Sequence, residues 1–358
     1  MTEYTNTAFE KSGGGRRWWF VGGAAALLIV LGAGYAAYWS SAADTARTAL
    51  DTWITGQRGA GMEVSHGKIE VAGFPFAIRI TIESPGLARA DRPRWSWQSE
   101  RLRAEARPWA PGRVRIDLGA AHEITFEGGG AARTGRITAA ESSLDMRFGL
   151  SGLESFSWSV QDLRLDSTDI VGSSGANRLD VVFDRTRNVQ GPMVSVYARG
   201  LALPLLGVDT LGLGSVIDEF GADVTVTGPL VGGPMDESVI AWRDGGGTLD
   251  LKRLRLRWGG LAVDGDGTLA LDDSLRPIGA LATRVIGLDE TIAALGDAGV
   301  LSPRDAAIAR ISINILARTS DSGRLEIPVS AQFGTLYLGQ VPIADLPPLT
   351  FPSAALTP

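Results

Sequence analysis

From Met62 onward, apolar residues recur at every second position, and this alternation restricts the fold more than any other feature. Residues 76–83 read FAIRITIE, the pattern of a strand with one apolar and one polar face. The alternation recurs at Val114/Ile116/Leu118, Leu163/Leu165, Val194/Val196, Val224/Val226, Leu254/Leu256/Trp258, Leu269/Leu271, Ile311/Ile313/Ile315 and Leu336/Leu338. Because Gly, Asp and Pro punctuate the gaps, the pattern predicts a mainly β (α+β) fold, an extended antiparallel sheet or sandwich.

Helical periodicity is restricted to short segments. The spacing of apolar residues predicts helices at Asp209–Phe220, Met235–Arg243, Asp289–Leu295 and Pro303–Ala309. These helices are too few and too short to cover a sheet of about ten strands. The sheet therefore either folds on itself as a closed sandwich or barrel, or leaves an apolar groove that suits an acyl chain.

Residues 20–39, FVGGAAALLIVLGAGYAAYW, form a stretch of twenty residues without a charge. As a helix it is about 30 Å long, which matches the hydrocarbon core of a bilayer. Aromatic residues that suit the two headgroup levels lie at its ends: Trp18, Trp19, Tyr35, Tyr38 and Trp39. The stretch predicts a single transmembrane anchor.

The charges on either side of this stretch predict its orientation. Lys11, Arg16 and Arg17 precede it, whereas Arg47 is the one basic residue within fifteen residues after it. The positive-inside rule then keeps the N-terminus in the cytoplasm and exports the rest. A cleaved signal peptide is the alternative, since residues 41–43 are small, but the apolar run is longer than usual for one.

A second apolar stripe follows the predicted span. It consists of Ala46, Ala49, Leu50, Trp53 and Ile54, at the spacing of one helix face. We expect a short amphipathic helix that ends near Gly56 and Gly59, lies at the membrane surface and uses Trp53 as an interface anchor.

The sequence contains no convincing catalytic or metal-binding constellation. Cysteine is absent, and the two histidines, His66 and His122, lie apart in strand-like stretches. The glycine-rich runs at 128–130 and 212–214 complete neither a phosphate loop nor a dinucleotide fingerprint. The net charge is −6, and the charged residues are spread along the chain without forming a basic face, which argues against nucleic acid as a partner. We therefore expect neither enzymatic activity nor a cofactor.

Two further patterns have competing interpretations. The DGDG run at 264–267, followed by Asp272 and Asp273, resembles part of a calcium loop, but hairpin turns explain it better. The run Trp95–Trp97, followed by Leu102, resembles Phe156–Trp158, followed by Leu163, with the same spacing. Either internal repetition or chance in a strand-rich chain explains that match.

The runs VAGFPF at 71–76, Trp95–Arg103 and ARPWAP at 106–111, after a single membrane span, resemble a proteobacterial family, domain of unknown function 2125. Its motif residues are structural in type: Gly73, Phe74, Pro75, Pro108, Trp109 and Pro111. Gly73 permits an unusual turn, Pro75 fixes the entry into a strand, and Trp109 is a bulky core or rim residue.

A weaker resemblance covers residues 247–341, which are similar to the C-terminal portion of AsmA-like envelope proteins. That resemblance implies an inner-membrane anchor, a periplasmic β-rich domain and a role in lipid homeostasis. The expected parts are a cytoplasmic tail (1–19), a transmembrane anchor (20–39), an amphipathic helix or linker (40–58), a periplasmic β-rich domain (59–341) and a Pro-rich tail (342–358). The sequence leaves open whether the β-rich domain consists of two halves, with a boundary near 200–245.

The function hypothesis combines the alternation with these resemblances. An apolar groove is expected to bind a lipid or another hydrophobic ligand, with the bilayer and other envelope proteins as partners. The candidate groove residues are Ile78, Ile80, Ile82, Leu254, Leu256, Trp258, Leu269 and Leu271. A closed sandwich that acts as an envelope scaffold and a hydrolase with dispersed carboxylates are the alternatives.

Overall fold

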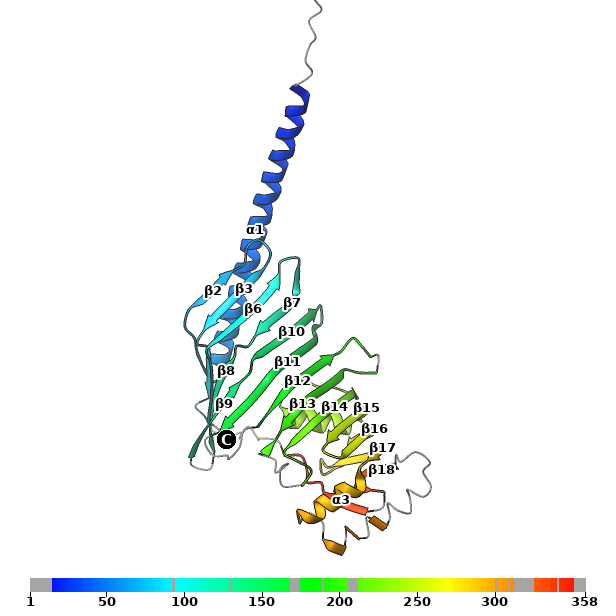
Figure 1. Cartoon of the computed structure of the whole chain (residues 1–358). Helices are drawn as coiled ribbons and strands as arrows, with labels where there is room; N and C mark the ends of the chain where they lie inside the picture. Colours follow the sequence, from blue (N-terminus) through cyan, green and yellow to red (C-terminus); the bar gives the residue numbers. More distant parts are fainter. Residues whose placement is uncertain are drawn as a thin grey trace, which may run out of the picture.

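The structure is a computed structural model that combines one long helix with one large antiparallel sheet (Figure 1). It describes residues 15–89, 91, 94–128, 131–167, 174–188, 190–204, 212–299, 302–304, 306–307, 310–311, 325–339 and 341–350. Helix α1 (Gly15–Gly59) projects from one end of the sheet, and the chain then runs along the sheet to its other end. The predicted mainly β fold with an N-terminal apolar helix is confirmed.

Helix α1 contains 45 residues, so it is about 68 Å long. It is long and apolar enough to cross a membrane. The amphipathic helix predicted at 40–58 is not a separate element, because α1 continues through it without a break. Residues 40–55 contain neither glycine nor proline, and the hydroxyls of Thr45 and Thr48 donate to carbonyls four residues earlier. The helix ends at Gly59, as predicted.

The first part of the sheet consists of eleven segments. They are β1 (Met62–Ser65), β2 (Ile69–Ala72), β3 (Ile78–Glu83), β4 (Gly86–Arg89), β5 (Trp95–Ser99), β6 (Arg101–Arg107), β7 (Ala110–Asp117), β8 (Ala121–Gly128), β9 (Ala131–Thr138), β10 (Glu141–Gly149) and β11 (Gly152–Ser167). One branch runs β2-β3-β6-β7-β10 and the other β1-β4-β5-β8-β9, and both join β11.

The two branches arise because each long strand bends once. Only one to three residues separate β3 from β4, β5 from β6, β7 from β8 and β9 from β10. Positive φ angles accompany two of these bends, at Ser84 (45°) and Gly119 (83°), and a further bend within β11, at Asp162 (49°). The bends lie next to one another across the paired strands, so the sheet folds along a line.

The second part of the sheet continues the same meander, each strand pairing antiparallel with the next. Its strands are β12 (Ser174–Asp184), β13 (Met193–Ala202), β14 (Val216–Thr227), β15 (Thr248–Trp258), β16 (Leu261–Leu271), β17 (Pro277–Ile286), β18 (Leu325–Gln332), β19 (Thr335–Leu338) and β20 (Val341–Asp345). The strands on either side of the connections within 200–245 belong to the same sheet, since β13 pairs with β14 and β14 with β15. Strand β20 extends into the segment that the sequence assigns to a Pro-rich tail.

Two of the predicted helices are confirmed, as α2 (Met235–Asp244) and α3 (Leu288–Asp297). The helix predicted at Asp209–Phe220 is wrong: residues 216–220 belong to β14, residues 212–215 are irregular, and residues 209–211 lie outside the described part. Pairing of β14 with β13 and β15 overrides the helical spacing there.

The last predicted helix and one predicted strand overlap the described segments near residue 310. The described residues of Pro303–Ala309 are helical, while 305 and 308–309 lie outside the described part. Ile311 is also helical, so the strand predicted from Ile311 is wrong at this residue. Ile313 and Ile315 lie outside the described residues.

Candidate functional site

The two faces of the sheet differ sharply in chemistry, and the strand register assigns each residue to a face. Residues directly opposite each other in paired strands share a face. The row that contains Ile80 runs through Ala104, Ile116, Leu144, Trp158, Val181, Val196, Ala222, Leu254, Gly265, Thr283 and Ile327. One face of the sheet is therefore apolar across twelve strands, and we call it the apolar face.

A parallel row two residues away has the same character. It contains Ile78, Ala106, Val114, Met146, Phe156, Phe183, Val194, Val224, Leu251, Gly267, Leu281, Val329 and Leu338. The rings of Phe156 and Phe183 stack with their centroids 5.6 Å apart. The two rows together form a band without a charged side chain.

All eight candidate groove residues belong to the apolar face, but they do not converge on one site. Ile78, Ile80 and Ile82 lie on β3, and the other five lie on β15 and β16. Eight steps between paired strands separate β3 from β15, which corresponds to about 40 Å along the sheet. The candidates mark two regions of one long face. Strands β10 to β14, between them, carry further apolar residues that were not among the groove candidates, although the predicted alternation includes Val194, Val196 and Val224.

Helix α1 covers the apolar face at the N-terminal end of the sheet. Its Ile54 is buried, and it packs on β1 and β3. A cavity of about 70 Å³ remains between the helix and the strands, which is room for one or two water molecules and too small for an acyl chain. Its apolar lining includes Trp53, Ile82, Leu87 and Trp97. Trp53 thus lines this cavity with part of its side chain, is 50% exposed, and lies about 21 Å along the helix from Trp39.

Helix α3 covers the opposite end. Ile292 of α3 and Ile327 of β18 are 4% and 3% exposed and form a buried cluster. Leu288, Ala306 and Leu338 pack against this pair. Because Ile327 belongs to the same row as Ile80, the two helices cover opposite ends of a single apolar face.

The centre of the apolar face, from β10 to β14, is buried in part. Val160 of β11 and Ala198 of β13, which share a row on this face, are each 1% exposed. Trp158, Val181, Val196 and Phe183 are neither fully buried nor fully exposed. Five strands span roughly 20 Å, which exceeds the length of an acyl chain in half of a bilayer core of about 30 Å.

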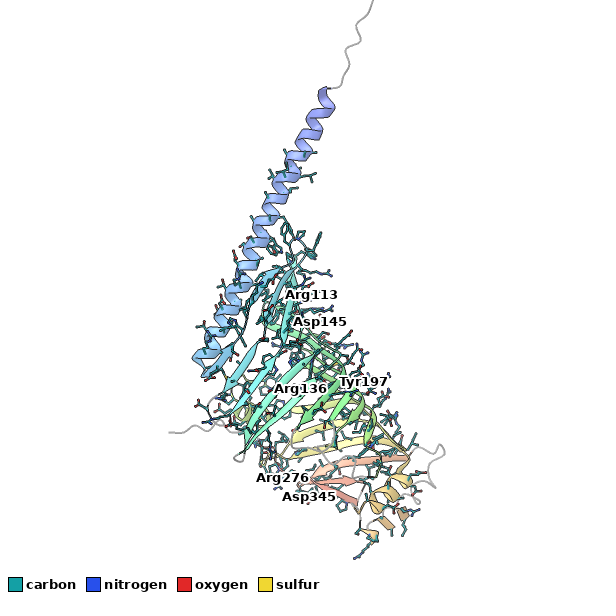
Figure 2. All side chains as sticks on the ribbon, turned by 60° about the vertical axis from the view of Figure 1, so that its left-hand side comes forward. Arg113, Arg136, Asp145, Tyr197, Arg276 and Asp345 are labelled. Carbon is teal, nitrogen blue, oxygen red and sulfur yellow. The ribbon has the colours of Figure 1, made fainter. Side chains whose placement is uncertain are left out.

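The opposite face carries ion pairs between neighbouring strands. Arg79 Nη2 lies 2.8 Å from Glu105 Oε2, and Arg115 Nε lies 2.8 Å from Asp145 Oδ1. Figure 2 shows Arg113 and Asp145 close together near the helix end of the sheet, with Tyr197 further along. Each exposed pair contributes little to stability. Together they keep this face in water and leave the other face for apolar contacts.

Asp264 is part of this charged face and not of a turn. The DGDG run lies inside β16, so both the hairpin-turn and the calcium interpretations are wrong at 264–267. Partial burial raises the pKa of Asp264, but hydrogen bonds and charges from Arg257 and Arg255 outweigh it, and its pKa is lowered overall. The turn interpretation is right at Asp272, whose carboxylate accepts from the backbone N–H groups of Ser274 and Arg276.

The lowered pKa of Asp264 predicts a contribution to acid sensitivity. A carboxyl with a depressed folded-state pKa stabilises the fold above its ordinary pKa, and this contribution is lost as pH falls below about 4. Asp264→Asn is expected to flatten the fall of the thermal midpoint between neutral and acidic pH. Asp266→Asn is the control, since the Asp266 carboxylate makes no hydrogen bond or ion pair within the described part of the chain. Circular dichroism measures the thermal midpoint at each pH. If both substitutions flatten its pH dependence equally, the pairing of Asp264 with Arg255 and Arg257 is not the cause.

The histidines do not form a site with each other. His66 is exposed at the bend between β1 and β2. His122 is half-buried, its ring stacks on Trp97 at 6.0 Å, and burial lowers its pKa. Within the described residues, no group of three or more His, Asp or Glu side chains could hold a metal ion.

The motif turns dock onto helix α1, a contact that sequence reasoning missed. Gly73 has a φ of 108°, and a Cβ there would lie 2.6 Å from the Ala77 carbonyl oxygen. The Tyr35 hydroxyl donates to the Pro75 carbonyl, and the Trp39 indole N–H donates to the Ala77 carbonyl at 2.9 Å.

The second motif turn docks beside the first. The Tyr38 hydroxyl donates to the Pro108 carbonyl at 2.7 Å. Pro108 is fully buried, whereas Trp109 is 59% exposed and is a rim residue, not a core residue. The spacing of Tyr35, Tyr38 and Trp39 at i, i+3 and i+4 is the sequence signal that places all three donors on one helix face.

The bent strands also bear on internal repetition. Trp97 and Leu102 lie on β5 and β6, on either side of a bend, and Trp158 and Leu163 lie on either side of the bend at Asp162 in β11. Both segments thus cross the fold line of the sheet. Their neighbours differ, because β5 pairs with β4 and β8, whereas the first part of β11 pairs with β10 and β12.

Comparison with known proteins connects this architecture to one family. No curated protein matches the chain, and no solved structure matches it. The model of the family described as "uncharacterized protein conserved in bacteria (DUF2125)" matches residues 39–347, from the end of the charge-free stretch to just past the last strand of the sheet. The match covers both docking turns and the whole apolar face. The chain belongs to the DUF2125 family of bacterial proteins.

Proposed function

We propose that this protein is anchored in the inner membrane by α1 and holds an acyl chain of a lipid on the centre of the apolar face. The observation that carries the proposal is the continuous apolar face, which is backed by a charged face and on which Trp158, Val181 and Val196 are only half-buried. Apolar surface of this extent, next to a helix fit to cross a membrane, suits a ligand that is itself apolar.

The anchor part of the proposal rests on the first half of α1. Leu28, Ile29 and Val30 are 66–71% exposed, so the sheet does not cover this part of the helix. The basic residues before it orient the N-terminus toward the cytoplasm and the sheet toward the periplasm. The proposed role is binding without chemistry, as a contribution to lipid homeostasis of the envelope.

A photo-crosslinking experiment tests lipid binding. The full chain is purified in mild detergent, exposed to a phospholipid with a diazirine on its acyl chain, irradiated and digested for mass spectrometry. Crosslinks are expected on peptides from β10 to β14. A pattern restricted to α1, or absent altogether, would contradict the proposal.

Val181 and Val182 provide a matched pair of variants for this experiment. They are neighbours on β12, both half-buried, and they point to opposite faces of the sheet. Val181→Asn places an amide on the apolar face and is expected to reduce crosslinking about tenfold, because burying an unpaired amide costs about 1–3 kcal/mol. Val182→Asn makes the same change on the charged face and is expected to leave crosslinking unchanged. Equal effects of the two variants would contradict binding on the apolar face.

A protein-interaction role is the second candidate, and one observation favours it. Four exposed apolar side chains gather around the connection between β14 and β15 and helix α2: Leu230, Val231, Met235 and Ile240. Such a patch suits another envelope protein. In a variant with these four residues replaced by polar ones, unchanged lipid crosslinking would show that the patch is not part of the lipid site.

A further inference from the structure

The geometry points to a second membrane contact beyond the anchor, formed by the two turns that dock onto α1. We infer that Phe74, Phe76 and Trp109 insert into the headgroup region of the bilayer around the helix. We call these three residues the membrane rim. The inference rests on the proposed anchor, and it adds a lipid surface as the partner of the sheet's edge.

The position of the rim follows from the hydrogen bonds that fix it to the helix. Tyr35, Tyr38 and Trp39 lie in the last five residues of the charge-free stretch, and the first charged residue after them is Asp44. Trp39 donates to the Ala77 carbonyl, and Tyr38 donates to the Pro108 carbonyl. If residues 20–39 fill the hydrocarbon core, these bonds hold both turns at its boundary, with Tyr35 about 6 Å deeper than Trp39.

The side chains of the two turns suit that boundary. Phe74, Phe76 and Trp109 are 55%, 73% and 59% exposed, although each is a large apolar group. The Phe74 ring meets the Trp39 ring edge-on at 5.5 Å, which continues the aromatic cluster from the helix onto the turn. Aromatic rings of this kind concentrate at the interface between hydrocarbon and headgroups.

The charge around the second turn also matches a phospholipid surface. Residues 108–112 and 71–78 contain no charged residue. Arg107 and Arg113 flank the second turn, both are exposed, and neither guanidinium makes a hydrogen bond or ion pair within the described part of the chain. Figure 2 places Arg113 at the helix end of the sheet. Two guanidinium groups beside the uncharged turn 108–112 can reach lipid phosphates while Trp109 of this turn enters the interface.

The rim connects the membrane to the apolar face. Phe76 lies in the turn that ends just before β3, two residues from Ile78, the first residue of that strand on the apolar face. The rim thus lies directly beside the first strand of the apolar face, at the end that α1 covers.

The absence of cysteine from the chain allows a direct test with single-cysteine variants. Each variant of the full chain is labelled with a nitroxide and reconstituted into vesicles of equal parts phosphatidylethanolamine and phosphatidylglycerol. Spin-label accessibility to oxygen and to a water-soluble nickel complex then reports depth. Val30→Cys marks the span, Phe76→Cys and Trp109→Cys mark the rim, and Leu230→Cys, 59% exposed on the connection before α2, marks the aqueous part of the domain.

The rim predicts a graded result. Labels at 76 and 109 are expected to have oxygen-to-nickel ratios between those at 30 and 230. Water-like ratios at 76 and 109, with a hydrocarbon-like ratio at 30, would overturn the rim while the anchor stands. A water-like ratio at 30 would overturn the anchor and the rim together, whatever the crosslinking of lipid to the apolar face.

Discussion

Ile327→Ala is expected to lower the free energy of unfolding by about 2–5 kcal/mol, the usual range for removing a large aliphatic side chain from a packed core. Ile327 is 3% exposed and packs with Ile292 of α3 and with Leu338 of β19. The change removes most of the buried cluster that holds α3 on the apolar face. Chemical denaturation of the full chain in detergent, followed by circular dichroism, measures the effect.

Ile286→Ala is the control for this prediction. Ile286 lies on β17, the strand that pairs with β18, but it is 45% exposed and does not belong to the apolar face. Its substitution is expected to change stability by about 0.5 kcal/mol or less. Similar losses for both variants would show that α3 does not depend on Ile327 for its place on the sheet.

Gly73→Ala is expected to destabilise the turn that docks onto α1 by at least about 1–3 kcal/mol, from the backbone conformation alone. The φ of Gly73 is 108°, where side chains are disfavoured, and the added Cβ would lie 2.6 Å from a backbone oxygen of Ala77. Ala77 also accepts the hydrogen bond from Trp39, so relief of the clash would displace this acceptor. Hydrogen exchange of residues 69–80 is expected to quicken together with the loss of stability.

Gly232→Ala is the matched change for Gly73→Ala. Gly232 lies in the connection before α2, no atom lies within 4 Å of its added Cβ, and its φ is outside the left-handed range. This variant is expected to be neutral or slightly stabilising, because it only restricts the unfolded chain. A neutral Gly73→Ala variant would mean that the turn does not need this glycine.

The two parts of the architecture were predictable to different degrees. The alternation around Ile80 and around Leu254 correctly predicted strands with one apolar face, because side chains on a strand point to alternate sides. The register could not be predicted, since it depends on which strands become neighbours. Only the paired strands show that Ile80 and Leu254 share a face yet lie far apart.

The sequence misled where local and tertiary preferences conflict. The spacing from Asp209 to Phe220 favours a helix in isolation, but Phe220 pairs within the sheet. The DGDG run favours a turn, but Gly265 and Gly267 lie within β16, where an added Cβ would come within 2.9 and 2.2 Å of carbonyl oxygens on β17. Glycine here serves the close approach of two strands, a requirement that the residue type alone does not reveal.

The sequence by itself determined the apolar helix, the strand-rich composition of the chain and the alternation that makes one side of each strand apolar. Each of these depends on the identity and spacing of nearby residues. The tertiary structure alone decided where the strands bend, such as at Ser84 and Asp162, and that the motif turns dock onto Tyr35 and Trp39. Those features depend on contacts between residues far apart in the chain, whose free energies no local pattern encodes.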